Sequence, residues 1–194
     1  MAAPVATETP LSAAEFLARY GDRSGVELVR GRVVWDSDES GTEAGMPKFR
    51  HGVVSNRIAH VLTAFVESNG LGWVVGNDTF VQTEHALDTV RGADVLFVSY
   101  RRVPKQDPIP EDLTQPPELV VEVLSPSNRQ GDMLKKVGEY LNAGVVVVLV
   151  VDPETECVSL FRQNELPQRF HNGDELTLPD VLPGFSVRTK QLFA

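Results

Sequence analysis

Cysteine, basic residues and long apolar runs are all scarce in this sequence. A single cysteine, Cys157, stands among 194 residues, which excludes a disulfide framework and a cysteine-rich metal site. The first ten residues, MAAPVATETP, have neither the basic segment nor the apolar segment of a signal peptide. The longest apolar run, AGVVVVLVV at 143–151, is well short of the ~20 residues that a membrane helix needs. We therefore expect a cytoplasmic protein that does not enter a membrane.

Acidic residues outnumber basic ones, with 27 Asp and Glu against 18 Lys and Arg, a net charge of −9 and a pI near 4.9. This balance argues against a broad basic surface for nucleic acid, but it leaves room for a local basic groove. Many of the acids lie in 36–43 and 107–118, which we expect to be loops. The length predicts one domain, residues 11–194, behind a flexible tail at 1–10.

The N-terminal half shows three local signals. In the segment 11–20, Ser12 and Glu15 have the spacing of a capping box, which predicts the start of a helix. Residues 26–35 read as a β-hairpin. Apolar residues recur every three or four positions over 50–68, which predicts an amphipathic helix.

The rest of the chain reads as strands around one more helix, residues 129–142. The predicted strands are 71–76 and 79–83, joined by a turn at Asn77-Asp78, then 93–99, 118–124 and 145–151, with short strands after them. The strand–helix–strand order over 118–151 implies a parallel strand pair with a right-handed crossover. We therefore predict an α/β or α+β domain: a mixed central β-sheet flanked by helices, with an N-terminal helix and hairpin.

Two carboxylates stand at strand positions. Glu122 lies inside the apolar run of PPELVVEVLSPSN (116–128), where an unpaired charge is costly. Asp94 stands second in the strand ADVLFVS. Two carboxylates on neighbouring strands suit Mg²⁺, which can activate water and neutralise charge on a phosphate. The alternative is structural: Asp94 as a turn residue at a strand start, and Glu122 as the partner of an arginine.

A lysine on the following helix adds to this pattern. At 100° per residue, Lys136 falls at the edge of the apolar face, beside Met133 and Tyr140. Lys135 points away from that face. Lys136 is therefore the lysine that can lean toward the sheet, although a boundary lysine whose stem covers apolar surface is the ordinary alternative.

Taken in order, several segments resemble the Uma-type restriction endonuclease family of the PD-(D/E)XK nuclease superfamily. They span roughly 11–162 and are VELVRGRVV (26–34), RHGVVSNRIAHVL (50–62), GADVLFVS (92–99), PPELVVEVLSPSN (116–128), DMLKKVGEYLNAGV (132–145) and VVDP (150–153). The resemblance implies a restriction-endonuclease-like core, a Mg²⁺ or Mn²⁺ cofactor and hydrolysis of phosphodiester bonds.

The resemblance also implies roles for individual residues. Asp94 matches the motif aspartate and Glu122 matches the (D/E) position. Leu124 stands where the motif lysine would be, and Lys136 is similar to a lysine that has migrated to the next helix. These three polar residues are the predicted catalytic core, with both carboxylates as metal ligands.

Three further positions complete the predicted site. Glu27 fits a family glutamate that binds metal or orients a water, and the carbonyl of Val123 could add a metal ligand. His51 fits a histidine that contacts phosphate or acts as an acid or base near neutral pH. The alternatives are a hairpin surface acid for Glu27 and a polar helix-start residue for His51. Three departures from the family pattern are Ala93 in place of the motif proline, GVVVVL at 144–149 in place of GVPEYW, and a longer gap between Asp94 and Glu122 because of the proline-rich loop 101–117.

The sequence thus favours a Mg²⁺-dependent endodeoxyribonuclease that cuts double-stranded DNA, with a homodimer suited to cutting both strands. Expected phosphate contacts come from scattered arginines: Arg50, Arg57, Arg91, Arg101, Arg102 and Arg129. A second interpretation is a non-catalytic interaction or regulatory protein on a nuclease fold, since fold does not decide function. A third is a phosphodiesterase for a substrate other than DNA.

Overall fold

The computed structural model of the chain describes residues 9–35, 49–106, 108–125 and 130–193. The predicted tail up to residue 8 and the predicted acidic loop at 36–43 lie outside the described residues. Among the residues that are described, no helix is long and apolar enough to cross a membrane.

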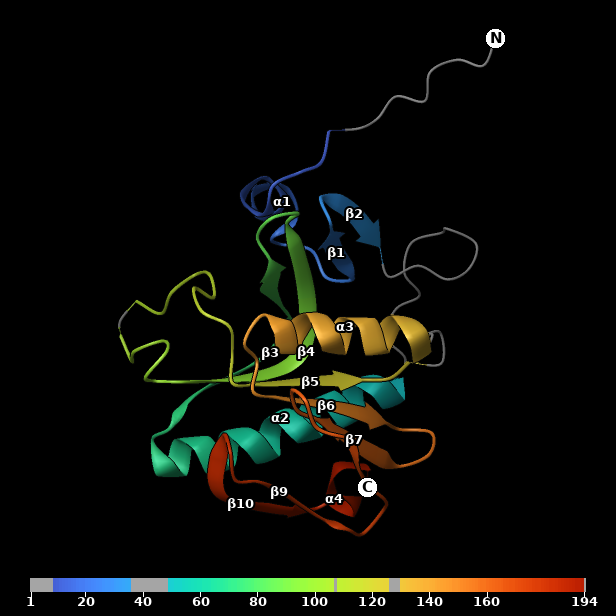
Figure 1. Cartoon of the computed structure of the whole chain (residues 1–194). Coiled ribbons are helices and arrows are strands. Elements are labelled where there is room, and N and C mark those ends of the chain that lie inside the picture. Colours follow the sequence, from blue (N-terminus) through green and yellow to red (C-terminus); the bar gives the residue numbers. More distant parts are fainter. Residues whose placement is uncertain (1–8, 36–48, 107, 126–129, 194) are drawn as a thin grey trace.

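Four helices and ten strands follow one another along the described chain (Figure 1). In order they are α1 (Ala13–Tyr20), β1 (Val26–Val29), β2 (Arg32–Trp35), α2 (Phe49–Asn69), β3 (Gly72–Glu84), β4 (Thr89–Ser99), β5 (Leu119–Val123), α3 (Gln130–Asn142), β6 (Val147–Asp152), β7 (Cys157–Phe161), β8 (Gln168–Phe170), β9 (Glu175–Leu178), β10 (Leu182–Arg188) and α4 (Lys190–Phe193).

The predicted start of the first helix is confirmed. The Ser12 side chain accepts a hydrogen bond from the backbone N–H of Glu15 at 3.2 Å, and the Glu15 carboxylate accepts one from the backbone N–H of Ser12 at 2.9 Å. This reciprocal capping box satisfies two N–H groups that would otherwise lack partners at the helix start. Phe16 of the same helix packs with Val26 and Leu28 of the hairpin.

The central sheet has eight strands and is mixed, as predicted. Its order is β2-β1-β4-β5-β6-β7-β8, with β3 paired to β4. β5 and β6 are parallel and joined through α3, which confirms the predicted crossover, and the other pairs are antiparallel. β9 and β10 form a separate two-stranded sheet.

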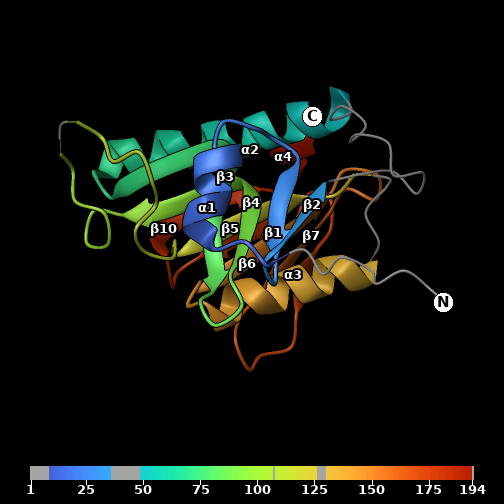
Figure 2. The ribbon, with the colours of Figure 1, turned by 90° about the horizontal axis from the view of Figure 1, so that it is seen from above.

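Helices cover both faces of the central sheet (Figure 2). α2 packs on one face through a buried stripe at four-residue spacing: Val54, Ile58, Leu62 and Val66. α3 packs on the other face through Met133, Val137 and Tyr140. The strands between them are apolar on both sides because both of their faces are buried.

One predicted turn is wrong. The sequence places a turn at Asn77-Asp78, but β3 runs through these residues and the turn lies at 85–88. Asn77 and Asp78 have φ values of 67° and 54°, and the register between β3 and β4 shifts there. Two residues of β3 thus oppose one of β4, which is a β-bulge. As a further correction, Asp94 lies in the middle of β4 rather than at the start of a strand.

β1 and β5 both pair with the edge of β4 that lies opposite β3, and the place where they diverge is called the fork below. β3 pairs along nearly the whole of one edge of β4, so β1 and β5 must share the other edge. β1 pairs with β4 at Leu28 and Val90, whereas β5 pairs with it from Val95 onward. Residues 91–94 of β4 therefore face the gap where β1 and β5 diverge, and α3 crosses over this gap.

Candidate active site

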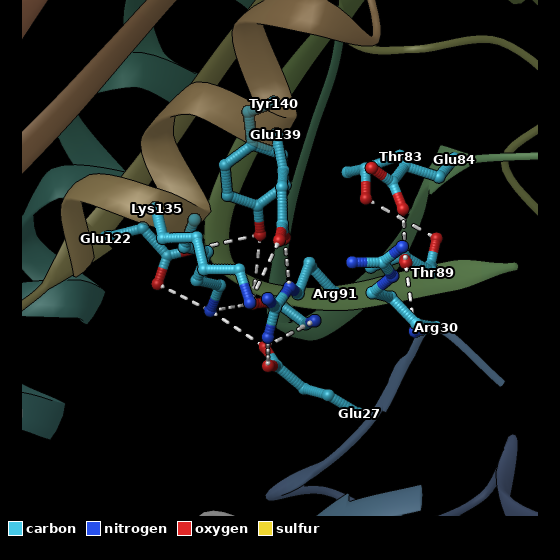
Figure 3. A network of polar contacts seen from close by, with 12 residues as sticks. Glu27, Arg30, Thr83, Glu84, Thr89, Arg91, Glu122, Lys135, Glu139 and Tyr140 are labelled. Carbon is cyan, nitrogen blue, oxygen red and sulfur yellow. Dashed lines mark hydrogen bonds and ion pairs between the residues drawn. The ribbon is translucent and has the colours of Figure 1, made fainter. Parts of the chain in front are cut away.

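The fork collects side chains from β1, β4, β5 and α3 into one polar network (Figure 3). Glu27 enters from β1, Glu122 from β5, and Lys136 and Tyr140 from α3. The chain brings these groups together because α3 is anchored by its apolar face to the sheet beside the fork.

Lys136 lies at the centre of the network. Its ammonium group donates to Glu122 Oε2 at 2.9 Å and to the backbone carbonyl of Gly92 at 2.8 Å, and it lies 2.9 Å from Glu27 Oε1. Its side chain is 15% exposed. An ammonium group has three N–H donors, so these three acceptors satisfy all of them, which compensates for the burial of the charge.

Glu122 is buried and receives two hydrogen bonds. Besides the contact with Lys136, its Oε1 accepts from the hydroxyl of Tyr140 at 2.8 Å. Burial raises the pKa of Glu122 to about 7, and the nearby charge of Asp94 adds to that rise, while Lys136 opposes it. Burial is therefore only partly offset by the lysine, and the carboxyl group is ready to change charge near neutral pH.

Glu27 is held by two cations and a backbone donor. Its Oε2 lies 2.6 Å from Arg91 Nη1, and its Oε1 accepts from the backbone N–H of Gly92 at 3.2 Å in addition to facing Lys136. Burial favours the neutral form, but Lys136 and Arg91 outweigh it and hold the pKa of Glu27 below its usual value. Glu27 thus stays negatively charged and positions the lysine.

Asp94 lies where the alternation of β4 is interrupted. Ala93 packs with the α3 face and Val95 with the α2 face, so the intervening side chain lies close to the plane of the sheet. Its Oδ2 accepts from the backbone N–H of Val123 at 2.6 Å, and its Oδ1 lies 3.3 Å from His51 Nε2. Asp94 and Glu122 are therefore on neighbouring strands, with Asp94 bonded to the residue that follows Glu122.

His51 reaches the same region from the first turn of α2. The contact with Asp94 raises the pKa of His51 above its ordinary value; burial opposes this, and the backbone of Val123 and the carboxylate of Asp78 reinforce it. The imidazole therefore lies among oxygen atoms from three strands, and it favours the protonated form.

Asp78 is a member of this group that the sequence did not reveal. Burial raises the pKa of Asp78, and the charge of Asp94 raises it further. Its backbone and Cβ lie next to Gly92, where an added Cβ would come within 3.4 Å of them. Its signal in the sequence is the pair Asn77-Asp78, which predicts a turn rather than a site residue.

The oxygen donors fit a hard divalent cation. Mg²⁺ typically takes one or two carboxylates and keeps several waters, and Asp94, Glu122 and the carbonyl of Val123 supply that kind of donor from adjacent strands. Within the described part of the chain, no group of three or more His, Cys, Asp or Glu side chains has the arrangement of a metal site. Both Glu27 oxygens already contact Lys136, Arg91 or the backbone N–H of Gly92, so Glu27 fits an orienting role better than direct ligation.

The predicted phosphate-binding arginines have different surroundings. Arg91 is buried between two glutamates and does not face solvent, so that prediction is wrong for this residue. Arg102 is bonded to Glu118 and to backbone carbonyls. Arg57 and Arg101 are exposed. The remaining two are Arg50, which pairs with Glu156, and Arg129, which lies outside the described residues.

Comparison with known proteins agrees with this architecture. The family model described as "Putative restriction endonuclease", Uma2, matches residues 13–190. A solved structure of a "putative nuclease belonging to DUF820" from Anabaena variabilis ATCC 29413 aligns with a TM-score of 0.79 at 18% identity, over 95% of this chain and 98% of that one. No curated protein matches the chain. On the extent of the family match, the chain belongs to the Uma2 family.

Proposed function

We propose that this protein is an endodeoxyribonuclease that uses Mg²⁺ or Mn²⁺ to hydrolyse phosphodiester bonds in double-stranded DNA. The observation that carries this proposal is the position of Lys136, whose buried ammonium lies between Glu122 and Glu27. A positive charge held beside carboxylates suits phosphodiester hydrolysis, because negative charge accumulates on the phosphate in the transition state and a cation stabilises it.

Asp94, Glu122 and the carbonyl of Val123 would hold the cation. A bound Mg²⁺ or Mn²⁺ supplies a water of lowered pKa and a positive charge beside the scissile phosphate. In the hydrolysis, the water oxygen would form the new bond to phosphorus and lose a proton to solvent, while the bond from phosphorus to the leaving sugar oxygen would break and that oxygen would take a proton from solvent. The network Lys136–Glu27 keeps the lysine in place throughout, because Glu27 retains its negative charge.

Lys136 would act on the reacting atoms directly. Its three N–H groups are all engaged in the network. A shift of Glu122 Oε2 toward a cation would free one of these N–H groups to donate to the phosphate or to the attacking water. A contact made mainly in the transition state is worth about 3–4 kcal/mol. His51, beside Asp94, would contact the phosphate in this proposal.

Cleavage of both DNA strands favours a homodimer in this proposal, since each chain offers one such site. Exposed cations would contact the backbone phosphates, and Arg57 and Arg101 are the available ones among the arginines considered above.

The net charge of −9 favours a second candidate function, a non-catalytic interaction or regulatory protein on the same fold. An acidic molecule gains little general attraction to DNA. This candidate differs from the first in one measurable respect, since it requires no metal-dependent cleavage.

The test is cleavage of supercoiled plasmid and of linear double- and single-stranded DNA by the full-length protein, in millimolar Mg²⁺ or Mn²⁺ and in EDTA. Asp94→Asn should lower the rate by about a hundredfold or more, whereas Asp112→Asn, which changes the same charge on an exposed loop residue, should not. Equal rates for Asp94→Asn and wild type would refute the site. Cleavage of a phosphodiester other than DNA, with DNA left intact, would instead identify another substrate.

A further inference from the structure

Arg91 has no part in the reaction steps proposed above, although it lies in the same polar network. Its side chain is 10% exposed, with Nη1 2.6 Å from Glu27 Oε2 and Nε 2.6 Å from Glu139 Oε2. A guanidinium group holds these donors in one rigid plane, so Arg91 sets the separation and orientation of the two carboxylates. Both contacts are charge-assisted and close, which makes them stronger than neutral hydrogen bonds.

The two carboxylates belong to different layers of the fold. Glu27 is on β1, whereas Glu139 is on α3, one turn beyond Lys136. Residues three apart on a helix lie on the same side of it, so α3 presents Lys136 and Glu139 to the fork together. The contacts therefore close a circuit. Lys136 contacts Glu27, and Figure 3 shows Arg91 between Glu27 and Glu139, through which the circuit returns to α3.

This circuit constrains the lysine in two ways. Arg91 orients the Glu27 carboxylate, whose other oxygen faces Lys136 at 2.9 Å. It also ties α3 to β4, so the helix cannot rotate and carry Lys136 away from the fork. A lysine side chain is flexible and gives no such directional restraint itself.

We propose that Arg91 is a positioning residue, which acts through Glu27 and Glu139 to hold Lys136 at the fork. As a contribution to catalysis this rests on the proposed function; as a statement about the position of Lys136 it does not. Arg91 is not a phosphate contact, because its guanidinium is buried and already shared between two carboxylates.

Amine labelling tests the inference without any nuclease assay. The full-length protein is treated with a limiting amine-directed reagent, and the modification of Lys136 is measured by peptide fragmentation relative to Lys190. Lys190 is exposed at the start of α4 and serves as the internal reference, because Lys135 lies 4.0 Å from Glu139 and its surroundings change in the variants. Wild type should label Lys190 much more than Lys136. Arg91→Met should increase labelling of Lys136 roughly tenfold, the change expected when a hydrogen bond between charged groups is lost.

Arg162→Met is the matched control. Arg162 is also largely buried, with a 15% exposed side chain and contacts to Glu165 and Asp180, but it lies outside the fork. Its replacement should leave the labelling of Lys136 unchanged. An unchanged Lys136 in Arg91→Met, or an equal increase in both variants, would overturn the inference.

Two further variants separate orientation from charge and from folding. Arg91→Lys keeps the charge but cannot contact both carboxylates in one rigid plane. Labelling of Lys136 should therefore increase in Arg91→Lys as it does in Arg91→Met. Full protection in Arg91→Lys would refute positioning through the guanidinium. Glu139→Leu removes the acceptor on α3 while Arg91 stays paired with Glu27. It should also increase Lys136 labelling, which decides the question if Arg91→Met does not fold.

Cleavage kinetics then connect the position to the reaction. Arg91→Met should lower kcat about tenfold or more with little change in KM, because it disturbs the lysine rather than DNA binding. A rise in KM with kcat unchanged would contradict the inference. If wild type cleaves no nucleic acid, the proposed function fails, while the labelling result still decides whether Arg91 positions Lys136.

Discussion

Replacing Glu122 by glutamine should change how the stability of the protein depends on pH. The folded-state pKa of Glu122 is about 7, against an ordinary value of 4.5, and burial is the main cause. Between these two values the folded state binds more protons than the unfolded state, so stability falls as pH rises. The difference of about 2.5 between the two pKa values corresponds to roughly 3–4 kcal/mol in total, at about 1.4 kcal/mol for each pKa unit.

The assay is urea unfolding in EDTA at pH 5 and pH 8 for wild type and Glu122→Gln. Wild type should lose roughly 2–3 kcal/mol more than the variant between the two pH values, because pH 5 already lies slightly above the ordinary pKa of the group. Glutamine keeps the volume and still accepts from Tyr140. Any repulsion between its amide and Lys136 is present at both pH values, so it cancels in the comparison. If wild type and Glu122→Gln lose the same stability between pH 5 and pH 8, the argument that Glu122 carries a buried, destabilising charge at high pH is refuted.

Glu118→Gln tests a second buried glutamate, which directly precedes β5. Glu118 is also buried, but it accepts from the backbone and hydroxyl of Ser99 at 2.9 and 2.6 Å and pairs with Arg102 at 3.2 Å. Its replacement should lower stability by about 1–3 kcal/mol at both pH values, because a charged acceptor is lost while its donors remain. Similar behaviour of the two variants would mean that Glu122 is an ordinary structural ion-pair partner.

Three further predictions concern the candidate site. Lys136→Ala should abolish Mg²⁺-dependent cleavage, with a loss of about a hundred- to a thousandfold, and Lys135→Ala should retain most activity; equal losses would contradict the assignment of the lysine. Millimolar Mg²⁺ or Mn²⁺ should raise the melting temperature of wild type, since the ion binds only the folded state, and Asp94→Asn should abolish this rise; a shift that persists in the variant would place the ion elsewhere. Tyr140→Phe should lower stability more at pH 8 than at pH 5, because the hydroxyl stabilises the charged form of Glu122; chemical denaturation shows this, and a uniform loss would argue against it.

Local patterns in the sequence were sufficient for most of the framework. The capping box of Ser12 and Glu15 and the apolar stripe of α2 depend only on residues within a few positions of each other, and both are confirmed. The parallel pair of β5 and β6 follows from a strand–helix–strand order that permits few topologies. The turn at Asn77-Asp78 failed because a bulge and a turn accept the same residues at positive φ.

For the site, the sequence could determine directions but not neighbours. Helical periodicity is sufficient to turn Lys136 toward the sheet and Lys135 toward solvent, and a charge inside an apolar strand is sufficient to single out Glu122. Three contacts could be known only from the tertiary structure. They are the contact of Glu27 with Lys136, the burial of Arg91 between Glu27 and Glu139, and the approach of Asp78 to Gly92. The physical reason is that the fork arises from the register of β1 and β5 on a shared edge of β4. Strand period shows which face a side chain takes, whereas only the pairing of distant segments decides what it meets there.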